Sequence, residues 1–411
     1  MAIKTLEFLI KQFSNYYRNN GNAIALPPQF EQREFAFFWF SREGALRHTS
    51  FASTEELVHF LSQEGPAHTF YSAAYYKTPD APQMPLKGWQ GADLIFDIDA
   101  DHFDLPCQRR HDVWWCLDCG HREHGRRPDQ CTECNGNQLR ELKWMCEECL
   151  GKAKEESIKI IQNFLLPDFG ISQSDIMIVF SGHRGYHIHC FTPQLHSLGS
   201  HERREIVDYI SGTGIDFRHQ GFGDTAYGVP KGPDMRTPGW ERKIALGIRT
   251  LFKNPQELNQ IPGLRVNQSR ILQREAESIH QSLSEQPARY MTPKGVGRKA
   301  WYTITQYVIE SIGALVDEPV TTDIHRLIRL PGSLNGKTGF LVKQLDLTSL
   351  EEFDPFQYAQ VFTGKVTVEI KDAPAFTLSG VHYPPMREIK KELPLSAAML
   401  LMCKGVAELV K

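Results

Sequence analysis

The placement of cysteine is the feature that most constrains this chain. Of its nine cysteines, seven fall between Cys107 and Cys149. Two Cys-x-x-Cys pairs lie inside that segment, Cys116 with Cys119 and Cys131 with Cys134. Two such turns present four thiolates to one ion, which is the closed tetrahedral shell of a structural Zn²⁺ site. The sequence therefore predicts a zinc ribbon whose metal has no open position for catalysis.

A second set of possible ligands surrounds this ribbon, namely Cys107, His111, Cys146 and Cys149. If the ribbon is a hairpin, its base brings both ends of the set together, and the four residues can hold a second Zn²⁺. The alternative is a group of reduced surface thiols beside a solvated His111. His121 and His124 could replace a cysteine of the ribbon, but four thiolates are present, so we expect both to be solvated. We place an inserted zinc-binding stem at residues 105–149.

The charge balance limits where nucleic acid can bind. The chain has 46 Lys and Arg against 49 Asp and Glu, a net charge of −3, and 41% hydrophobic residues. This composition is typical of a soluble globular protein with two or three domains, or one large domain with insertions. Any polynucleotide site must then be a local basic patch. The chain opens without a signal-peptide pattern, and segment 395–402 is too short to cross a bilayer, so we expect a cytoplasmic protein without membrane contact.

Apolar periodicity predicts helices and strands that alternate along the chain. Strand-like segments occur at 35–40, 68–76, 93–99, 176–180 and 186–191. Helical spacing is found near 53–61, 147–166, 268–288, 297–314 and 395–410, the last expected to be an amphipathic helix. Residues 192–265 are rich in Gly, Pro, Arg and His, so we expect loops there with one helix near 201–211. Such alternation favours α/β layers over a helical bundle.

Two carboxylates end the strand expected at 93–99. Residues i and i+2 of a strand share a face, so Asp97 and Asp99 project together while Phe96 and Ile98 face the other way. Paired carboxylates repel each other unless cations lie between them, and Mg²⁺ or Mn²⁺ is the natural partner. An Asp-x-Asp pair alone is a weak signal because many are exposed strand ends. The apolar run before Asp97 strengthens it.

Two further stretches carry groups suited to phosphate. Ser181-Gly-His183-Arg184-Gly-Tyr-His187 follows an apolar strand, and its glycines allow tight turns beside hydroxyl, guanidinium and imidazole donors. Farther along, Asp317 precedes a segment that contains Arg326, Arg329, Lys337 and Lys343. By charge alone, a solvated basic face is an equally good interpretation of that segment. Acidic metal ligands, phosphate-binding side chains and a distant third carboxylate together indicate nucleotidyl transfer.

These motifs resemble the small, catalytic subunit of archaeal and eukaryotic DNA primase, and the archaeal branch fits best. The resemblance covers nearly the whole chain. It is carried by Arg33-Glu-Phe35, Leu46-Arg-His-Thr-Ser-Phe51, Ser72-Ala-Ala-Tyr-Tyr76, Phe96-Asp-Ile-Asp99, and residues 181–187, 316–323, 326–334, 336–339 and 401–408. It implies an α/β, mixed-sheet primase fold flanked by helices. Residues 1–104 and 150–411 would form this catalytic domain, with 192–315 as a loop-rich and helical excursion.

The resemblance also implies the chemistry. Asp97, Asp99 and Asp317 match the catalytic carboxylates of the family, which implies a two-metal site for Mg²⁺ or Mn²⁺. Positions that match nucleotide-binding residues are Ser181, His183, Arg184, His187, Arg329 and Lys337, and Arg47 is expected to line the same cleft. Cys107, His111, Cys146 and Cys149 match a zinc knuckle of archaeal members.

The activity implied is that of a primase, a DNA-directed RNA polymerase and nucleotidyltransferase. It would make short RNA or RNA/DNA primers on single-stranded DNA from nucleoside triphosphates, for replication. A large primase subunit would be its partner in a heterodimer within the primosome.

Two departures from the family pattern leave questions open. The ribbon from Cys116 to Cys134 is extra, and it could contact the template or dock a partner. Asn335 stands where the family often has His. A neutral amide can hydrogen-bond a ribose or phosphate but carries no charge, so nucleotide affinity or sugar preference is expected to differ. Alternatives to a replicative primase are a primase-polymerase acting in repair, a non-catalytic zinc-ribbon nucleic-acid-binding protein and a metal-dependent nuclease.

Overall fold

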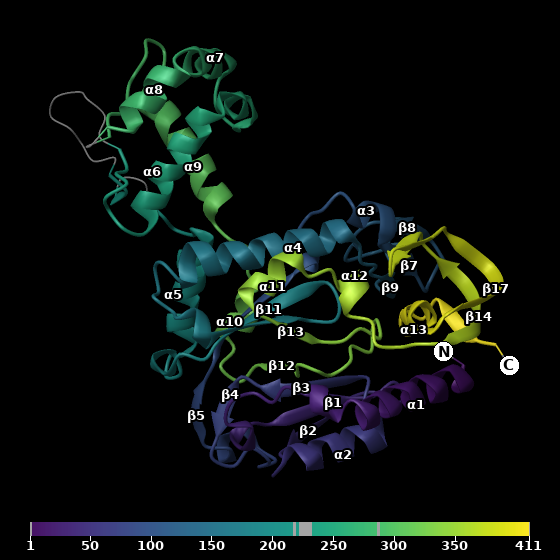
Figure 1. The fold of residues 1–411 in the computed structure, drawn as a ribbon. Helices are drawn as coiled ribbons and strands as arrows, with labels where there is room; N and C mark the ends of the chain where they lie inside the picture. Colours follow the sequence, from purple (N-terminus) through teal and green to yellow (C-terminus); the bar gives the residue numbers. More distant parts are fainter. Residues whose placement is uncertain (1, 217–218, 222–231, 286–287, 411) are drawn as a thin grey trace. The chain divides into compact units, whose positions relative to one another are not determined.

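The structure, a computed structural model, describes residues 2–216, 219–221, 232–285 and 288–410 of the 411-residue chain (Figure 1). The chain divides into two compact units. The first comprises Met1–Ile158, Ile171–Arg204 and Val316–Lys411, and the second comprises Lys159–Gly170 and Glu205–Leu315. The stem placed at 105–149 therefore lies within the first unit, and most of the excursion placed at 192–315 lies in the second.

One sheet of the first unit carries the polar motifs. Its strands are β6 (Leu94–Asp99), β10 (Ile176–Phe180), β11 (Gly185–Cys190) and β13 (Lys343–Leu345), antiparallel in the order β13-β10-β11-β6. Tyr186 pairs with Ile98 and Ile188 with Phe96, and all four side chains are buried. Helix α4 (Glu147–Ile160) covers this apolar face, because its Leu150 and Lys154 line a cavity together with Tyr186. The opposite face is left for the polar residues.

A second sheet of the same unit supports the first. It consists of β1 (Phe35–Phe38), β2 (Ala45–Thr49), β3 (His68–Ser72) and β12 (Leu327–Arg329), in the order β12-β3-β1-β2. Helices α1 (Ile3–Asn19) and α2 (Thr54–Glu64) lie beside it in Figure 1. Phe37 of β1 packs against Phe60 of α2, with ring centroids 4.6 Å apart. The Tyr71 hydroxyl lies 3.1 Å from His189 Nδ1, and this contact joins the two sheets.

The C-terminal segment corrects one expectation. Helix α13 spans only Leu395–Cys403 and is not amphipathic, since Leu401 and Met402 are both 0% exposed. The chain then turns at Gly405, where φ is 74°, and Ala407–Leu409 form strand β18. A helix that is buried on all sides needs no polar face, and this explains why the residues of α13 are almost all apolar.

Strand β18 belongs to a small third sheet. It pairs with β14 (Lys365–Ala373), which also pairs with β17 (Met386–Pro394). The Leu409 N–H donates to Thr5 Oγ1 at 3.0 Å, so the last strand is bonded to the first helix.

The inserted stem folds as one short helix and three strands. These are α3 (Gln108–His111), β7 (Val113–Cys116), β8 (Arg122–His124) and β9 (Leu139–Leu142), with the strands in the order β8-β7-β9. The other elements with a bearing on the first unit are β4 (Ala74–Tyr76), β5 (Trp89–Ala92), α5 (Ser200–Ser211), α10 (Glu318–Thr322), α11 (Leu347–Glu352), α12 (Pro355–Tyr358), β15 (Phe376–Leu378) and β16 (Val381–Tyr383).

The second unit is helical and contains one helix that we did not expect. Its helices include α6 (Trp240–Lys253), α7 (Val266–Arg274), α8 (Ala276–Leu283) and α9 (Arg298–Ile312). We expected 240–253 to be loop, but Ile244, Ile248 and Leu251 recur at helical spacing and are buried. Neighbouring Pro, Gly, Arg and Lys hide this short pattern in the sequence. Across the described ranges, no helix combines the length and apolar character that crossing a bilayer requires.

Candidate active site and zinc centres

Strand β6 places two of the expected carboxylates at its end. Asp97 is opposite His187, and Asp99 is opposite Gly185, in the antiparallel pairing with β11. Both aspartates are half-buried, whereas Ile98 between them is 1% exposed. His187 Nε2 lies 3.6 Å from Asp97 Oδ1. Strand alternation alone predicts this arrangement of the two carboxylates.

Asp317 reaches the same place from a distant part of the chain. It directly precedes helix α10, and its backbone N–H donates to the Asp97 carbonyl at 3.0 Å. Burial, with the charges of Asp99 and Asp317, raises the pKa of Asp97 to about 7. Burial and the charge of Asp101 likewise raise the pKa of Asp99. Crowded carboxylates in a partly buried site need a positive partner, so their chemistry fits divalent metal ions.

The loop between β10 and β11 holds the predicted phosphate-binding stretch. Gly182 has φ 75°, and a Cβ there would lie 2.7 Å from the Asn335 Cβ, so the turn requires glycine. Ser181 Oγ accepts a hydrogen bond from the His183 N–H at 3.4 Å. Burial is the main cause that lowers the pKa of His183 and of His187 well below the ordinary value. Both imidazoles are therefore neutral hydrogen-bonding groups.

Arg184 is enclosed by the protein. Its side chain is 0% exposed, and Nη1 lies 2.9 Å from Asp112 Oδ2 and 3.0 Å from Asp101 Oδ1. Its Nη2 lies 3.9 Å from Cys149 Sγ. The guanidinium thus joins Asp101, which follows strand β6, to Asp112 in the inserted stem. We expected Arg184 to bind nucleotide, but this placement favours a supporting role over direct contact.

Arg329 is held beside the carboxylates by the second sheet. Its Nη1 lies 2.9 Å from His68 Nδ1, and its guanidinium carbon is 4.9 Å from the centre of the Phe70 ring. Burial lowers the pKa of Arg329 to about 10, although the charges of Asp97 and Asp99 act to raise it. The residue therefore remains a cation at neutral pH.

The other three expected nucleotide-binding residues differ in their surroundings. Lys337 is exposed at the loop that follows β12. Asn335 is 0% exposed; its Nδ2 donates to the Ser181 carbonyl at 2.9 Å, and its Oδ1 accepts from the Lys337 N–H at 2.9 Å. Its amide holds two loops together, so we expect any influence on nucleotide binding to be indirect. Arg47 lies on β2, where its Nε donates to Glu34 Oε1 at 3.0 Å rather than to the three carboxylates.

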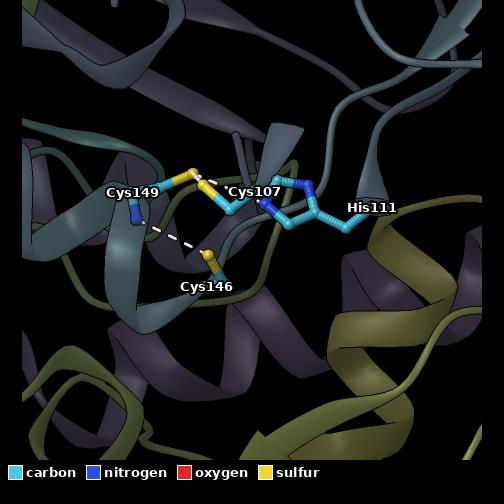
Figure 2. Close-up of side chains that lie close together, drawn as sticks. All are labelled: Cys107, His111, Cys146 and Cys149. Carbon is cyan, nitrogen blue, oxygen red and sulfur yellow. Dashed lines mark hydrogen bonds between the residues drawn. The ribbon is translucent and has the colours of Figure 1, made fainter. Parts of the chain in front are cut away.

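Four ligand side chains converge at the base of the stem, and we call them the knuckle site (Figure 2). The ligand atoms of Cys107, His111, Cys146 and Cys149 all lie within 4.8 Å of one another. Cys149 Sγ is 3.3 Å from Cys107 Sγ and 3.5 Å from His111 Nε2. His111 Nδ1 lies 2.8 Å from Asp112 Oδ1, a partner that fixes the tautomer and leaves Nε2 for a metal. Three thiolates and one imidazole fit Zn²⁺.

The ribbon site, formed by Cys116, Cys119, Cys131 and Cys134, has the same compactness. Its sulfur atoms pair at 3.6 Å, Cys116 with Cys134 and Cys119 with Cys131. His121 and His124 lie outside this set. Within the described ranges, only the knuckle and ribbon sites bring three or more His, Cys, Asp or Glu ligand atoms so close. The carboxylates of Asp97, Asp99 and Asp317 are therefore spaced more widely than either set of possible zinc ligands.

Several charged residues around the site were missed by sequence reasoning, namely Asp101, Asp112, Lys143 and Lys404. The Asp101 N–H donates to Asp99 Oδ1 at 2.9 Å, and Lys143 Nζ donates to Asp101 Oδ2 at 2.6 Å. Asp112 is adjacent to the predicted ligand His111, and Asp101 is two positions from Asp99, a spacing that could have revealed both. Lys404 Nζ lies 2.8 Å from His183 Nε2 across 221 positions of sequence, and no local pattern signals that contact.

Comparison with known proteins places this chain among its relatives. A family model described as DNA primase small subunit matches residues 137–347 of the 411. The DNA primase small subunit PriS of Methanothrix thermoacetophila is 36% identical over 99% of this chain and 100% of its own length. PriS of Methanosarcina acetivorans is 36% identical over 99% of this chain and 97% of its own. For PriS of Cenarchaeum symbiosum the identity is 30%, over 99% of both chains. The chain belongs to the DNA primase small subunit family.

Proposed function

We propose that this protein is the catalytic small subunit of a replicative DNA primase, which makes short RNA or RNA/DNA primers on single-stranded DNA. The observation that carries the proposal is that Asp97, Asp99 and Asp317 meet at the end of β6, beside the loop between β10 and β11. The full-length similarity to primase small subunits supports it. A large primase subunit is the partner that we expect.

The arrangement suits in-line phosphoryl transfer, in which catalysis is mostly alignment and charge stabilisation. Asp97, Asp99 and Asp317 would hold two Mg²⁺ or Mn²⁺ ions. Such ions, when bound, lower the pKa of an attacking 3′-hydroxyl and neutralise the triphosphate. Ser181 and Lys337 offer a hydroxyl and a charge to the phosphates. Neutral His187 can donate a hydrogen bond next to Asp97 without adding charge to the site.

Both zinc sites would be structural, because each offers four protein ligands and no open position. The knuckle site is expected to fix the base of the stem against the catalytic strand. The ribbon site is expected to stabilise the outer part of the stem, where Trp114, Cys116 and Cys131 form only a small buried cluster. Small modules of this kind depend on their metal for folding.

The proposal is tested by primer synthesis on unprimed single-stranded DNA with labelled nucleotides and Mg²⁺ or Mn²⁺. We expect products from the wild-type chain, alone or with the large subunit. Asp317→Ala should abolish synthesis because two carboxylates cannot position both ions, while template binding measured by fluorescence anisotropy is kept. Asp323→Ala is the matched control, since Asp323 ends the helix that Asp317 begins.

Each outcome assigns a role. Normal synthesis by Asp317→Ala would remove that residue from the catalytic set. Absence of product even with the large subunit would reject the primase function, and release of nucleotides from DNA would indicate a nuclease. The same reactions, run with ribonucleotides or deoxyribonucleotides separately, give the sugar preference.

A further inference from the structure

A small cavity beside the loop between β10 and β11 has three lysines in its wall. It has a volume of about 230 Å³ and is lined by Glu141, Leu142, Lys143, His183, Lys337, Cys403 and Lys404. Three lysines thus face one glutamate. That glutamate is already engaged, because its carboxylate lies 3.5 Å from Lys143 Nζ and 3.9 Å from Arg127 Nε. The cavity has room and charge for an anion.

Lys404, in the wall of this cavity, has neutral hydrogen-bond partners and cations around it. Its Nζ donates to the Lys143 carbonyl at 2.6 Å and lies 2.8 Å from His183 Nε2. Both partners are uncharged, since His183 is neutral. Burial and the charges of Arg184 and Lys337 lower the pKa of Lys404 to about 7, although Asp112 and Asp101 act to raise it. Among the residues that the structure describes, Lys404 thus lies near cations and bonds to neutral acceptors, with no carboxylate partner.

Two hydrogen bonds link the wall of the cavity to the end of β6. Lys143 on its wall donates to Asp101, and the Asp101 N–H in turn donates to Asp99. Desolvation lowers the pKa of Lys337, and the charges of Asp101 and Asp99 act to raise it, so Lys337 lies within electrostatic reach of both. His183 belongs to the loop itself. An anion bound to Lys337 here would therefore lie within electrostatic reach of Asp99 and Asp101.

We propose that this cavity binds the terminal phosphates of the incoming nucleoside triphosphate, with Lys404 as a phosphate-binding residue. The proposal rests on the proposed function and adds Lys404 to the nucleotide-binding positions His183 and Lys337 that the resemblance implies. Lys404 follows helix α13 directly, His183 comes from the β10–β11 loop, and Lys337 comes from the loop after β12. Because three distant segments meet there, the cavity forms only in the folded first unit.

The test compares the binding of ATP and AMP in the presence of Mg²⁺, by titration calorimetry on the full chain. Wild-type protein should bind ATP more tightly than AMP. Lys404→Met should weaken ATP binding about tenfold, the worth of one hydrogen bond to a charged group, and leave AMP binding unchanged. Lys404→Arg keeps the charge and should restore most of the ATP affinity. Lys365→Met, at an exposed lysine paired with Glu392 on β14, is the control and should change neither.

The pH dependence supplies a second readout. A lysine with a pKa near 7 must take up a proton to bind phosphate at higher pH, so its contribution should fall between pH 7 and pH 9. We expect the ratio of wild-type to Lys404→Met affinity for ATP to shrink over that range. The Lys404→Arg protein should keep its advantage over Lys404→Met, because arginine stays charged.

The outcomes separate the two proposals. If the wild-type chain does not distinguish ATP from AMP, the proposed function itself is in error. If the wild-type chain binds ATP more tightly than AMP, and folded Lys404→Met protein keeps the same ratio of the two affinities, the cavity is not a phosphate site. The inference is then overturned. Loss of single-stranded DNA binding by Lys404→Met with unchanged ATP affinity would assign the cavity to the strand and overturn it as well.

Discussion

The knuckle and ribbon sites use similar ligands but are connected to the molecule very differently. In the knuckle site, Cys107 and Cys149 are both 0% exposed, whereas Cys119 and Cys134 of the ribbon site are exposed. Contacts run from the knuckle site to the catalytic strand through His111, Asp112, Arg184, Asp101 and Asp99. The ribbon meets the third sheet through the half-exposed pair of Arg122 and Asp372, 2.6 Å apart. The two sites therefore differ less in their ligands than in the residues that contact those ligands, and only the contacts of the knuckle site lead to the strand that carries Asp99.

Among variants that test this difference, Arg184→Met is expected to have the largest effect on stability. It would leave Asp101 and Asp112 without their buried cation, and breaking a buried pair costs about 3–5 kcal/mol. We expect that loss in the free energy of unfolding measured with urea, together with failure of priming. The matched Arg122→Met variant on the ribbon should change stability by less than about 1 kcal/mol. Equal effects of the two variants would contradict the comparison.

The next effect is that of Asp112→Asn, which preserves shape but removes the carboxylate facing His111. Loss of such a partner lowers metal affinity about 10–100-fold. One of two bound zinc ions should therefore be released at lower chelator concentration, measured by competition with a colorimetric chelator. Asp118→Asn is the control, because Asp118 lies 3.9 Å from Cys116 Sγ but contacts no histidine ligand. Unchanged zinc release would show that Asp112 does not support the knuckle site.

Replacement of both Cys131 and Cys134 by Ser should separate zinc content from activity. We expect one zinc ion fewer per chain by atomic absorption. Priming on a bare template should be largely kept, because the ribbon meets the third sheet through Arg122 and Asp372 and not through the catalytic carboxylates. A large loss of priming would place the ribbon in template binding, and an unchanged zinc content would remove the ribbon site altogether.

The smallest expected effect belongs to Arg122→Ala. An exposed ion pair is worth about 0.2–1 kcal/mol, and salt weakens it further. We expect a shift of that size in the free energy of unfolding at low salt, and a smaller one at high salt. A loss above about 2 kcal/mol would mean that the ribbon is anchored far more firmly than its exposure indicates.

Short-range chemistry was predictable from the sequence, because its spacing repeats locally. Cys-x-x-Cys pairs and an Asp-x-Asp strand end indicate their geometry within a few residues. The role of Arg184 was not predictable, since only tertiary packing decides which carboxylates enclose a guanidinium. The same holds for Lys404, whose partner is 221 positions away. The prediction of an amphipathic helix at 395–410 was wrong, because apolar content does not reveal how many sides of a helix are covered.

The bond between Leu409 and Thr5 has a consequence for the order of folding. It spans 404 positions, and contacts of such separation are slow to form because closing so long a loop costs entropy. During synthesis the helices at 240–312 leave the ribosome before strand β18 exists. The second unit can therefore fold while the first is still open, and the nascent chain carries an unpaired edge on β14 until the final strand arrives.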